Sequence, residues 1–436
     1  MKKTILSIAV ITAAIFAVSC QKEKLQGNTT SEGSASVFTA TIETVAGTKT
    51  TVERVDGTTV VYKTKWESTD KISINGVTYT ATPDATDATK ATFTKDSGDA
   101  PTGPFNAYFP ANMYSDSKAI LPASYTYTDG KYNMPMYAQS STTSLPFKNL
   151  CGVLAITVNG TDFTSVEKIE VFSDKQMNGE FTATADGVLT FASATLTDDN
   201  KKVALTFNTA KSIASDGSAT FYIPVPAGTH NPLAIKVTGG STPKVMVTKK
   251  SGGVAVVRNS VYPIAFNGQP ITGTAKRKGD IDVNWVQLWA GGPKFAEYNV
   301  GVTNGKAESY GDNCTWANNI ASSEWGSNWR MPTKVELENL LSNCTVVWTT
   351  VGGKSGRKFT GKGAYASNSV FLPAAGHYSK GGPITDRDFH GYYWSSTPGG
   401  SLGAYYLYFD LGSQYVNEGL YRLDYYSVRA VLAEED

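Results

Sequence analysis

Apolar and polar residues alternate along much of the chain, from residue 37 to about residue 267. Phe38, Ala40 and Ile42 would share one side of an extended segment, and the same alternation recurs in later segments. A period of two indicates a half-buried strand, and the abundant Thr residues suit exposed strand faces. Because this span lacks a convincing helical period and is long for one sandwich, we expect two tandem β-sandwiches.

The pattern changes beyond residue 280, where two helices are expected. Thr333 and Glu336 have the spacing of a capping box, which predicts that a helix begins here. An earlier helix is expected over residues 315–324, with Gly326 suited to end it. Short aromatic strands and Gly-rich turns follow. The predicted fold class is therefore mainly β, with two sandwiches followed by an α+β domain.

These patterns divide the chain into segments. We expect a first sandwich over 36–139, a second over 140–268, a linker over 269–280 and a C-terminal domain over 281–436. The linker contains Gly, Pro and the basic triplet Lys276-Arg277-Lys278, which we interpret as solvated spacing.

The first residues have the pattern of an export signal. Lys2 and Lys3 precede an apolar run that is too short to span a bilayer, so residues 1–19 are expected to be a signal peptide. The segment AVSC (17–20) resembles a bacterial lipobox, which implies lipidation of Cys20 and a tether over 20–35. The alternative is an ordinary signal peptide with a chance Cys. The lipobox resemblance places the protein at the outer membrane or cell surface.

Composition excludes some classes of function. A net charge of +1 argues against nucleic acid as a partner. His230, His377 and His390 lack metal-ligand spacing, and we expect neither a metal nor a cofactor. Cys314 and Cys344 are either a disulfide or two buried thiols, and the sequence leaves both open.

Tyrosine is concentrated near the C-terminus. Nine of the 23 tyrosines fall between Tyr392 and Tyr426, among Gly, Ser, Asn and Asp, with no Lys and the single Arg422. Tyr offers a large, stiff, amphipathic surface at low entropic cost, and small polar residues adapt around it. Lys is depleted at interface cores. The segment is therefore interpreted as a recognition surface.

Alternation separates the two sides of this segment. The apolar side, expected in the core, comprises Tyr405, Leu407, Phe409 and Leu411. The other side and its neighbouring turns form the expected ligand-binding set: Ser401, Leu402, Tyr406, Tyr408, Asp410, Tyr415, Asn417, Tyr421, Asp424 and Tyr425. The alternative is that these tyrosines pack against the sandwiches or one another, which we favour for Tyr393 and Tyr405.

Four segments between residues 37 and 267 carry a resemblance to a known family. They are WESTDKISI (66–74), FKNLCGVL (147–154), FYIPVPAG (221–228) and RNSVY (258–262). In this order they resemble the fimbrillin-like proteins of Bacteroidales. The resemblance implies transthyretin-like sandwiches in a lipoprotein pilus subunit, assembled by donor-strand addition after a cut behind an Arg. Arg54, the only Arg before Arg258, is the candidate for that cut, or else an exposed hairpin charge.

The region from 283 to 433 carries a second resemblance. WRMPT (329–333) with Glu336 and Leu340, LPAAG (372–376), YWSST (393–397) and SVR (427–429) resemble the C-type-lectin-like major paralogous domain of bacterial surface proteins. The resemblance implies a ligand-binding domain whose last segment is diversified by retroelements in some members. We interpret Trp329, Arg330, Trp394 and Arg429 as structural.

Together these features favour a cell-surface, pilus-tip-type adhesin and not an enzyme. Its partners would be other fimbrial subunits and a surface protein or glycan, with membrane contact only through the lipid anchor. One alternative is an outer-membrane-anchored glycan- or protein-binding lipoprotein outside any pilus. Another is an enzyme, either with Ser401 in a nucleophile elbow or, like formylglycine-generating oxidases of the lectin-like fold, with a Cys pair. Pro398 before Ser401 and an alternating strand after it argue against the elbow.

Overall fold

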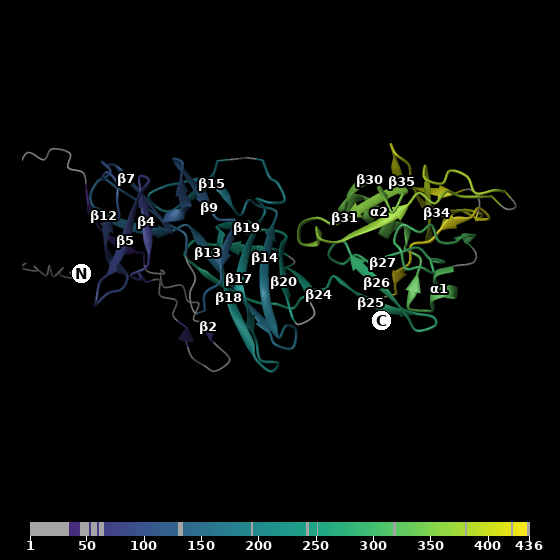
Figure 1. Ribbon diagram of the computed structural model, residues 1–436, viewed down its shortest axis with the longest axis horizontal. Helices are drawn as coiled ribbons and strands as arrows, with labels where there is room; N and C mark the ends of the chain where they lie inside the picture. The colour runs from purple at the N-terminus through teal and green to yellow at the C-terminus, as the bar shows by residue number, and fades with distance from the viewer. Residues whose placement is uncertain are drawn as a thin grey trace, which may run out of the picture.

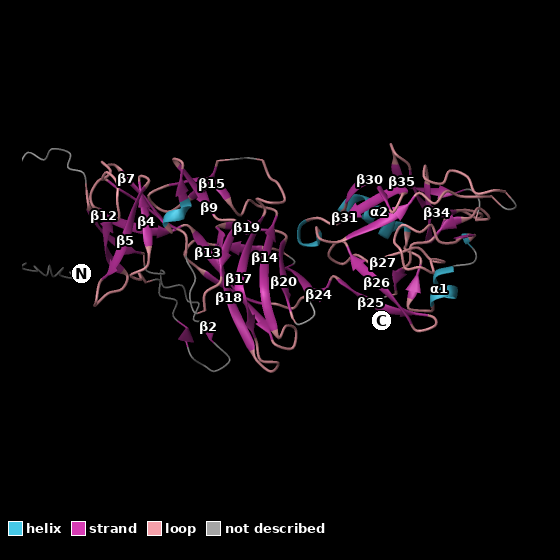
Figure 2. Ribbon diagram, in the orientation of Figure 1, coloured by secondary structure: helices cyan, strands magenta, loops and turns pink. Residues whose placement is uncertain are grey.

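The computed structural model describes residues 35–43, 52–53, 59–60, 65–129, 134–192, 195–240, 244–250, 252–316, 320–379, 382–419 and 422–433. The predicted signal peptide, Cys20, Arg54 and Tyr421 lie outside these residues. The fold is mainly β, with strands far outnumbering helices (Figure 2). Three bodies follow one another along the longest axis, in chain order (Figure 1).

The strands of the first body, where we expected a β-sandwich, form one sheet that closes on itself. Its sheet closes because β1 (Val37–Ile42) pairs antiparallel with β6 and parallel with β12. The other strands are β4 (Lys71–Ile74), β5 (Val77–Pro83), β6 (Lys90–Lys95), β7 (Phe105–Phe109), β11 (Met136–Ser140) and β12 (Ser144–Asn149). Trp66 lies in the core, where it contacts the edges of Phe93, Phe109 and Phe147. Because β12 belongs here, this body extends beyond the expected boundary at residue 139.

The second body has a six-stranded and a three-stranded sheet around one core. The larger sheet has the order β10 (Ser124–Thr126), β17 (Lys202–Ser212), β14 (Ser165–Ser173), β20 (Leu233–Gly239), β21 (Lys244–Lys250), β24 (Gln269–Pro270). The smaller has the order β18 (Ser218–Pro226), β13 (Cys151–Asn159), β23 (Val261–Ala265). Strand β10 of the second body precedes β11 and β12 of the first body in the sequence. The chain therefore passes between these two bodies more than once.

Smaller elements complete these two bodies. A four-stranded sheet has the order β16 (Leu189–Phe191), β15 (Gly179–Ala183), β9 (Lys118–Leu121), β8 (Tyr114–Ser115). Two two-stranded sheets pair β19 (Gly228–His230) with β22 (Val254–Val256) and β2 (Val52–Glu53) with β3 (Thr59–Val60). The 3-10 helix η1 (Ala111–Met113) precedes β8.

The C-terminal domain contains three small sheets and two helices. The first sheet has the order β25 (Thr272–Arg277), β26 (Ile281–Gln287), β27 (Lys294–Ala296), β37 (Val431–Leu432), β29 (Trp329–Arg330). The second has the order β28 (Asn313–Cys314), β36 (Tyr426–Ser427), β33 (Gly391–Pro398), β34 (Ala404–Phe409), β35 (Gln414–Gly419). The third comprises β30 (Thr345–Val351), β31 (Lys354–Thr360) and β32 (Ser369–Pro373), with η3 (Gly363–Tyr365) between the last two.

The segment expected to be a linker is mostly strand. Gln269 and Pro270 pair with β21 in the second body, whereas residues 272–277 pair with β26 in the C-terminal domain. Burial alternates along β25, so Lys276 lies on the exposed side, whereas Arg277 is half-buried with its guanidinium 5.8 Å from the centre of the Trp325 ring. Only Ile271, which is buried, separates the two pairings.

The two predicted helices are present. Helix α2 (Lys334–Asn343) begins with the predicted capping box, in which Thr333 Oγ1 accepts from Glu336 N and Glu336 Oε2 accepts from Thr333 N. Helix α1 (Ile320–Trp325) ends before Gly326, whose φ is +94°, as expected of a left-handed stop. It begins later than the predicted 315. Among the described residues, neither helix combines the length and apolar character needed to cross a bilayer.

Candidate functional site

The tyrosines of the C-terminal segment meet on one face of a sheet. Strand β34 lies between β33 and β35, so that Tyr408 is opposite Tyr392 on one side and Tyr415 on the other. Ring centroids are 5.2 Å apart for Tyr392 and Tyr408 and 4.9 Å apart for Tyr408 and Tyr415. We call Tyr392, Tyr406, Tyr408, Tyr415 and Tyr426 the aromatic face. Side-by-side strands make this surface because alternate side chains point the same way.

The other side of β34 lies in the core at Leu407 and Phe409, but Tyr405, which was also expected there, is only half-buried, with Lys334 Nζ 4.2 Å from its ring centre. Leu407 and Phe409 are fully buried, as predicted, and Tyr393 beside them is 1% exposed. Leu411 was also expected in the core, but this prediction was wrong, because its side chain is 72% exposed. The strand ends at Phe409, and the chain turns at Asp410, so the alternation no longer applies to Leu411.

Burial differs across the aromatic face: Tyr426 is buried, Tyr392, Tyr406 and Tyr408 are half-buried, and Tyr415 is exposed. Tyr392 is central, with ring centroids of Tyr426 at 5.1 Å and Tyr406 at 6.1 Å. Tyr415 at the outer edge is 45% exposed. Mutual contact fixes the rings, and the four tyrosines other than Tyr426 keep part of their surface accessible, which suits recognition with little loss of side-chain entropy.

Exposed apolar side chains surround the aromatic face on nearby loops. Leu402 is 69% exposed between β33 and β34, and Leu423 is 64% exposed in the turn before β36. Ser401 beside Leu402 is also exposed, as is Asn417 opposite Tyr406 on β35. Large exposed apolar groups at one end of a domain are a feature of interaction sites.

Two carboxylates of the expected ligand-binding set, those of Asp410 and Asp424, hold loops in place. Asp410 accepts hydrogen bonds from the Tyr408 hydroxyl (2.8 Å) and from the backbone N–H groups of Gly412 (2.7 Å) and Ser413 (2.6 Å). Partial burial opposes the change, but these bonds hold the pKa of Asp410 below its ordinary value. Asp424 accepts from the Ser379 hydroxyl at 3.0 Å. Both acids therefore order the rim of the site.

Two aromatic contacts secure the loops further. The ring of Tyr425 stacks on that of Tyr378 at 4.2 Å between centroids. The Arg422 guanidinium lies 4.3 Å from the centre of the Trp316 ring, and its Nε donates to Gly403 O at 2.7 Å. The single Arg of the Tyr-rich window is thus engaged within the domain.

Sequence reasoning missed four members of this neighbourhood. Tyr392 and Tyr426 were counted in the Tyr-rich window but not proposed as site residues, and pairing of β33 with β34 and β36 is what brings them here. His377 and His390 were considered only for metal spacing. Their Nδ1 atoms lie 3.7 and 3.6 Å from Asp386 Oδ2, and their rings adjoin Tyr392 and Tyr408, respectively.

Burial and nearby carboxylates change the acidity of these phenols. Burial, assisted by the Asp386 carboxylate, raises the pKa of Tyr392 to about 12. Burial and the hydrogen bond to Asp410 raise the pKa of Tyr408, and burial and Asp424 raise that of Tyr426. The phenols of Tyr392, Tyr408 and Tyr426 are therefore neutral at physiological pH. In the described ranges no three His, Cys, Asp or Glu side chains are placed to hold a metal ion.

The residues interpreted as structural are so in the described structure. Arg429, 2% exposed, donates to the carbonyls of Ala296, Glu297 and Phe371 and to Asn299 Oδ1. Burial lowers its pKa to about 10. Arg330 forms a two-pronged pair with Glu336 at 2.7 and 2.8 Å. These arginines join loops and do not face a ligand.

The residues of the enzyme alternatives have ordinary surroundings. Ser401 lies in an exposed loop between two strands, β33 and β34, whereas a nucleophile elbow joins a strand to a helix. Cys314 and Cys344 are free, buried thiols in two different core clusters. Burial raises the pKa of both to about 12, which keeps them protonated and weakly nucleophilic.

Comparison with known proteins gives only structural likenesses. No family model and no curated protein matches the chain. The structure is similar to that of a proposed cell adhesion protein from Bacteroides uniformis, with 18% identity, 46% of this chain and 88% of that chain covered, and a TM-score of 0.31. A proposed cell adhesion protein from Bacteroides ovatus gives 13% identity, 54% and 94% coverage and a TM-score of 0.35. A fimbrial protein from Bacteroides ovatus gives 8% identity, 85% and 95% coverage and a TM-score of 0.21.

Proposed function

We propose that this protein is a cell-surface adhesin that binds its target through the aromatic face of the C-terminal domain. The observation that carries the proposal is the meeting of Tyr392, Tyr406, Tyr408 and Tyr415 on one sheet face over the buried Tyr426, with exposed Leu402 and Leu423 in neighbouring loops. Tyr is enriched at interfaces because it combines apolar area with a hydroxyl, and clustered anchors supply most of the binding free energy.

We further propose that the chain is the tip subunit of a pilus. In this proposal the two N-terminal bodies are transthyretin-like domains, exported as a lipoprotein on Cys20 and joined to other subunits by donor-strand addition after a cut at Arg54. The last domain is C-type-lectin-like, and a retroelement diversifies its Tyr-rich segment. The two sequence resemblances support these points. Unchanged mass and assembly of Arg54→Ala would instead favour a membrane-anchored lipoprotein outside any pilus.

Binding by the aromatic face is tested with the full chain on glycan and protein arrays. The variant Tyr406→Ser/Tyr415→Ser should weaken capture of whichever target the wild type selects. If each tyrosine is a hot spot worth about 2 kcal/mol, each loss weakens binding about 30-fold. The matched control is Tyr222→Ser, a half-buried tyrosine of β18 in the second body. Equal binding by the double variant and the control would reject the aromatic face as the site.

A further inference from the structure

A cavity of about 350 Å³ lies where the second body meets the C-terminal domain. Phe172, Ala234 and Val247 line it from the second body, and Trp289, Ala364 and Tyr365 line it from the C-terminal domain. Cavities of this size hold small molecules, and interfaces between domains are a preferred place for them. This cavity is far in sequence from the aromatic face and shares none of its residues.

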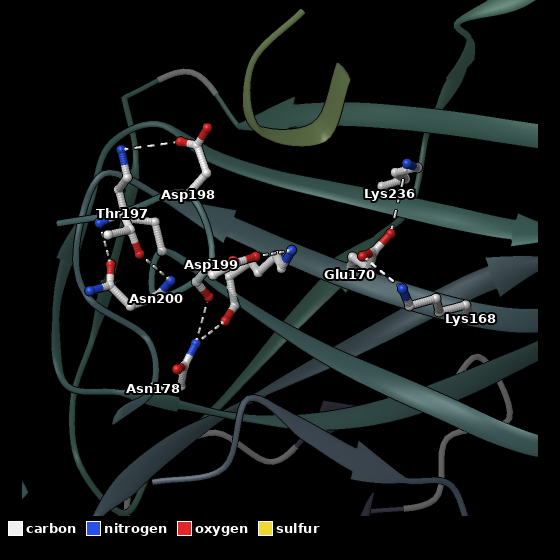
Figure 3. A network of polar contacts seen from close by, with 10 residues as sticks. Lys168, Glu170, Asn178, Thr197, Asp198, Asp199, Asn200 and Lys236 are labelled. Atoms are coloured by element: carbon white, nitrogen blue, oxygen red, sulfur yellow. Dashed lines mark hydrogen bonds and ion pairs between the residues drawn. The ribbon is translucent and has the colours of Figure 1, made fainter. Parts of the chain in front are cut away.

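The two sides of the cavity are packed together. A buried cluster spans the interface and comprises Val247, Ile271, Ala364 and Tyr365. Asn368 Nδ2 donates to the carbonyls of Ile271 (3.0 Å) and Gln287 (2.9 Å). Lys236, which pairs with Glu170 at 3.8 Å (Figure 3), donates across the interface to Ser367 Oγ at 3.3 Å. The cavity is thus part of a built interface and does not open by simple separation of two loose bodies.

A rigid turn forms one edge of the cavity. Thr197 N donates to Asn200 Oδ1 (2.8 Å), and Asn200 N donates to Thr197 Oγ1 (3.2 Å), which closes the turn on itself (Figure 3). Between and beside these residues, Asp198 and Lys201 line the cavity, with Lys201 Nζ 3.6 Å from Asp198 Oδ1. The turn therefore presents its charged side chains in a fixed place.

The charges lining the cavity are mainly positive. Lys201, Lys249 and Lys362 face a single carboxylate, that of Asp198. Asp198 already pairs with Lys201, and Lys362 Nζ donates only to the Ser342 carbonyl at 3.2 Å. Lys249 and Lys362 are exposed, and neither has a carboxylate partner among the described residues. Two ammonium groups are thus left to attract a negatively charged ligand.

Trp289 gives the cavity a flat wall. Its ring centroid is 6.0 Å from that of Phe295, and a Cβ at Gly292 would lie 2.4 Å from the indole. Glycine is therefore required for the close approach of this turn to the ring. The Gly292 carbonyl accepts from Gln287 Nε2 at 2.7 Å, which holds the turn against the indole. A fixed, half-buried aromatic surface suits stacking of another ring.

We infer that this cavity binds a small ring-shaped anion, the size of one sugar acid or aromatic carboxylate. The ring would lie against Trp289, and its carboxylate would reach Lys249 and Lys362. A ligand here would contact both bodies at once, so its binding would also stabilise their interface.

Isothermal titration calorimetry of the full chain tests this inference with three probes: galacturonate, benzoate and galactose. Binding of galacturonate or benzoate, but not of neutral galactose, is expected, and the better of the two acids identifies the source as sugar or aromatic. No binding of either acid, or equal binding of galactose, would overturn the inference.

Variants connect any binding to the cavity. Lys249→Gln/Lys362→Gln should weaken acid binding about tenfold or more, because the carboxylate loses its charge-assisted contacts. Lys118→Gln, an exposed lysine paired with Glu180 in another sheet, is the matched control. Trp289→Leu should weaken binding by every acid, and the Tyr406→Ser/Tyr415→Ser variant should leave it unchanged, which separates this site from the aromatic face. Wild-type affinity in the double lysine variant would place the acid elsewhere and reject the site.

Discussion

The two faces of the β33–β35 sheet differ although both contain tyrosine. Tyr393 points into the core, where its hydroxyl donates to Pro373 O at 2.7 Å and accepts from Asn299 Nδ2 at 3.1 Å. Tyr392, the preceding residue, lies on the aromatic face among other rings. Residue type therefore does not decide the role of a tyrosine here. The face of the strand decides it, since Tyr393 joins the core cluster of Leu407 and Phe409, whereas Tyr392 is half-buried on the opposite side.

The inner face should carry most of the stability. Phe409→Ala removes a fully buried ring that packs beside Tyr393 at 5.7 Å, and it should lower the free energy of unfolding by about 3–5 kcal/mol. Tyr415→Ala on the outer edge should cost about 1 kcal/mol or less, as is usual for exposed positions. Denaturant unfolding, followed by near-UV circular dichroism, compares the two. Similar losses from both variants would erase the distinction between the faces.

A smaller change, removal of the tyrosine hydroxyl alone, compares the two faces at a single group. Tyr393→Phe leaves the ring in place but removes both hydrogen bonds, so Asn299 and the Pro373 carbonyl each lose a partner. A loss of about 1–3 kcal/mol is expected, the cost of leaving buried polar groups unpaired. Tyr408→Phe, which removes one partly solvated bond to Asp410, should cost less than about 1 kcal/mol. Thermal unfolding measured on both variants should rank them in this order, and the reverse order would contradict it.

The smallest expected effect is a change in stability at alkaline pH. Burial holds the pKa of Tyr392 at about 12, above its ordinary value of 10.0. The unfolded chain loses this proton first, so the contribution of Tyr392 to stability is intact below pH 10 and is lost as the pH rises towards 12. Tyr392→Phe should therefore flatten the decline in stability over this window. An unchanged decline would show that the Tyr392 ring is not shielded as described.

Strand alternation predicted that Leu407 and Phe409 face the core, because it depends only on neighbouring residues. It placed Leu407 and Phe409 inside and Tyr406 and Tyr408 outside, and the capping box at Thr333 was equally local. The prediction that Leu411 lies in the core was wrong because Asp410 accepts hydrogen bonds from the backbone of the residues after it, which ends the strand. A period of two cannot say where a strand stops.

Local sequence patterns could not predict the features that depend on pairing between distant segments. Closure of the first barrel needs β1 to lie parallel to β12, and nothing local to either strand specifies that pairing. The same holds for Tyr426, which reaches the aromatic face only because β36 joins the sheet beside β33. The cavity at Trp289 depends on two bodies together. Local sequence patterns thus predicted a tyrosine-rich surface, and strand pairing determined which residues belong to it.

The junction at Ile271 has a mechanical consequence. With one buried residue between the β21–β24 pairing and the β25–β26 pairing, the chain has almost no slack there. A pull on the last domain would reach the neighbouring sheet directly through backbone hydrogen bonds and the packed cluster around Tyr365. Force applied to the C-terminal domain would therefore be transmitted directly to the second body, because no extensible tether lies between them.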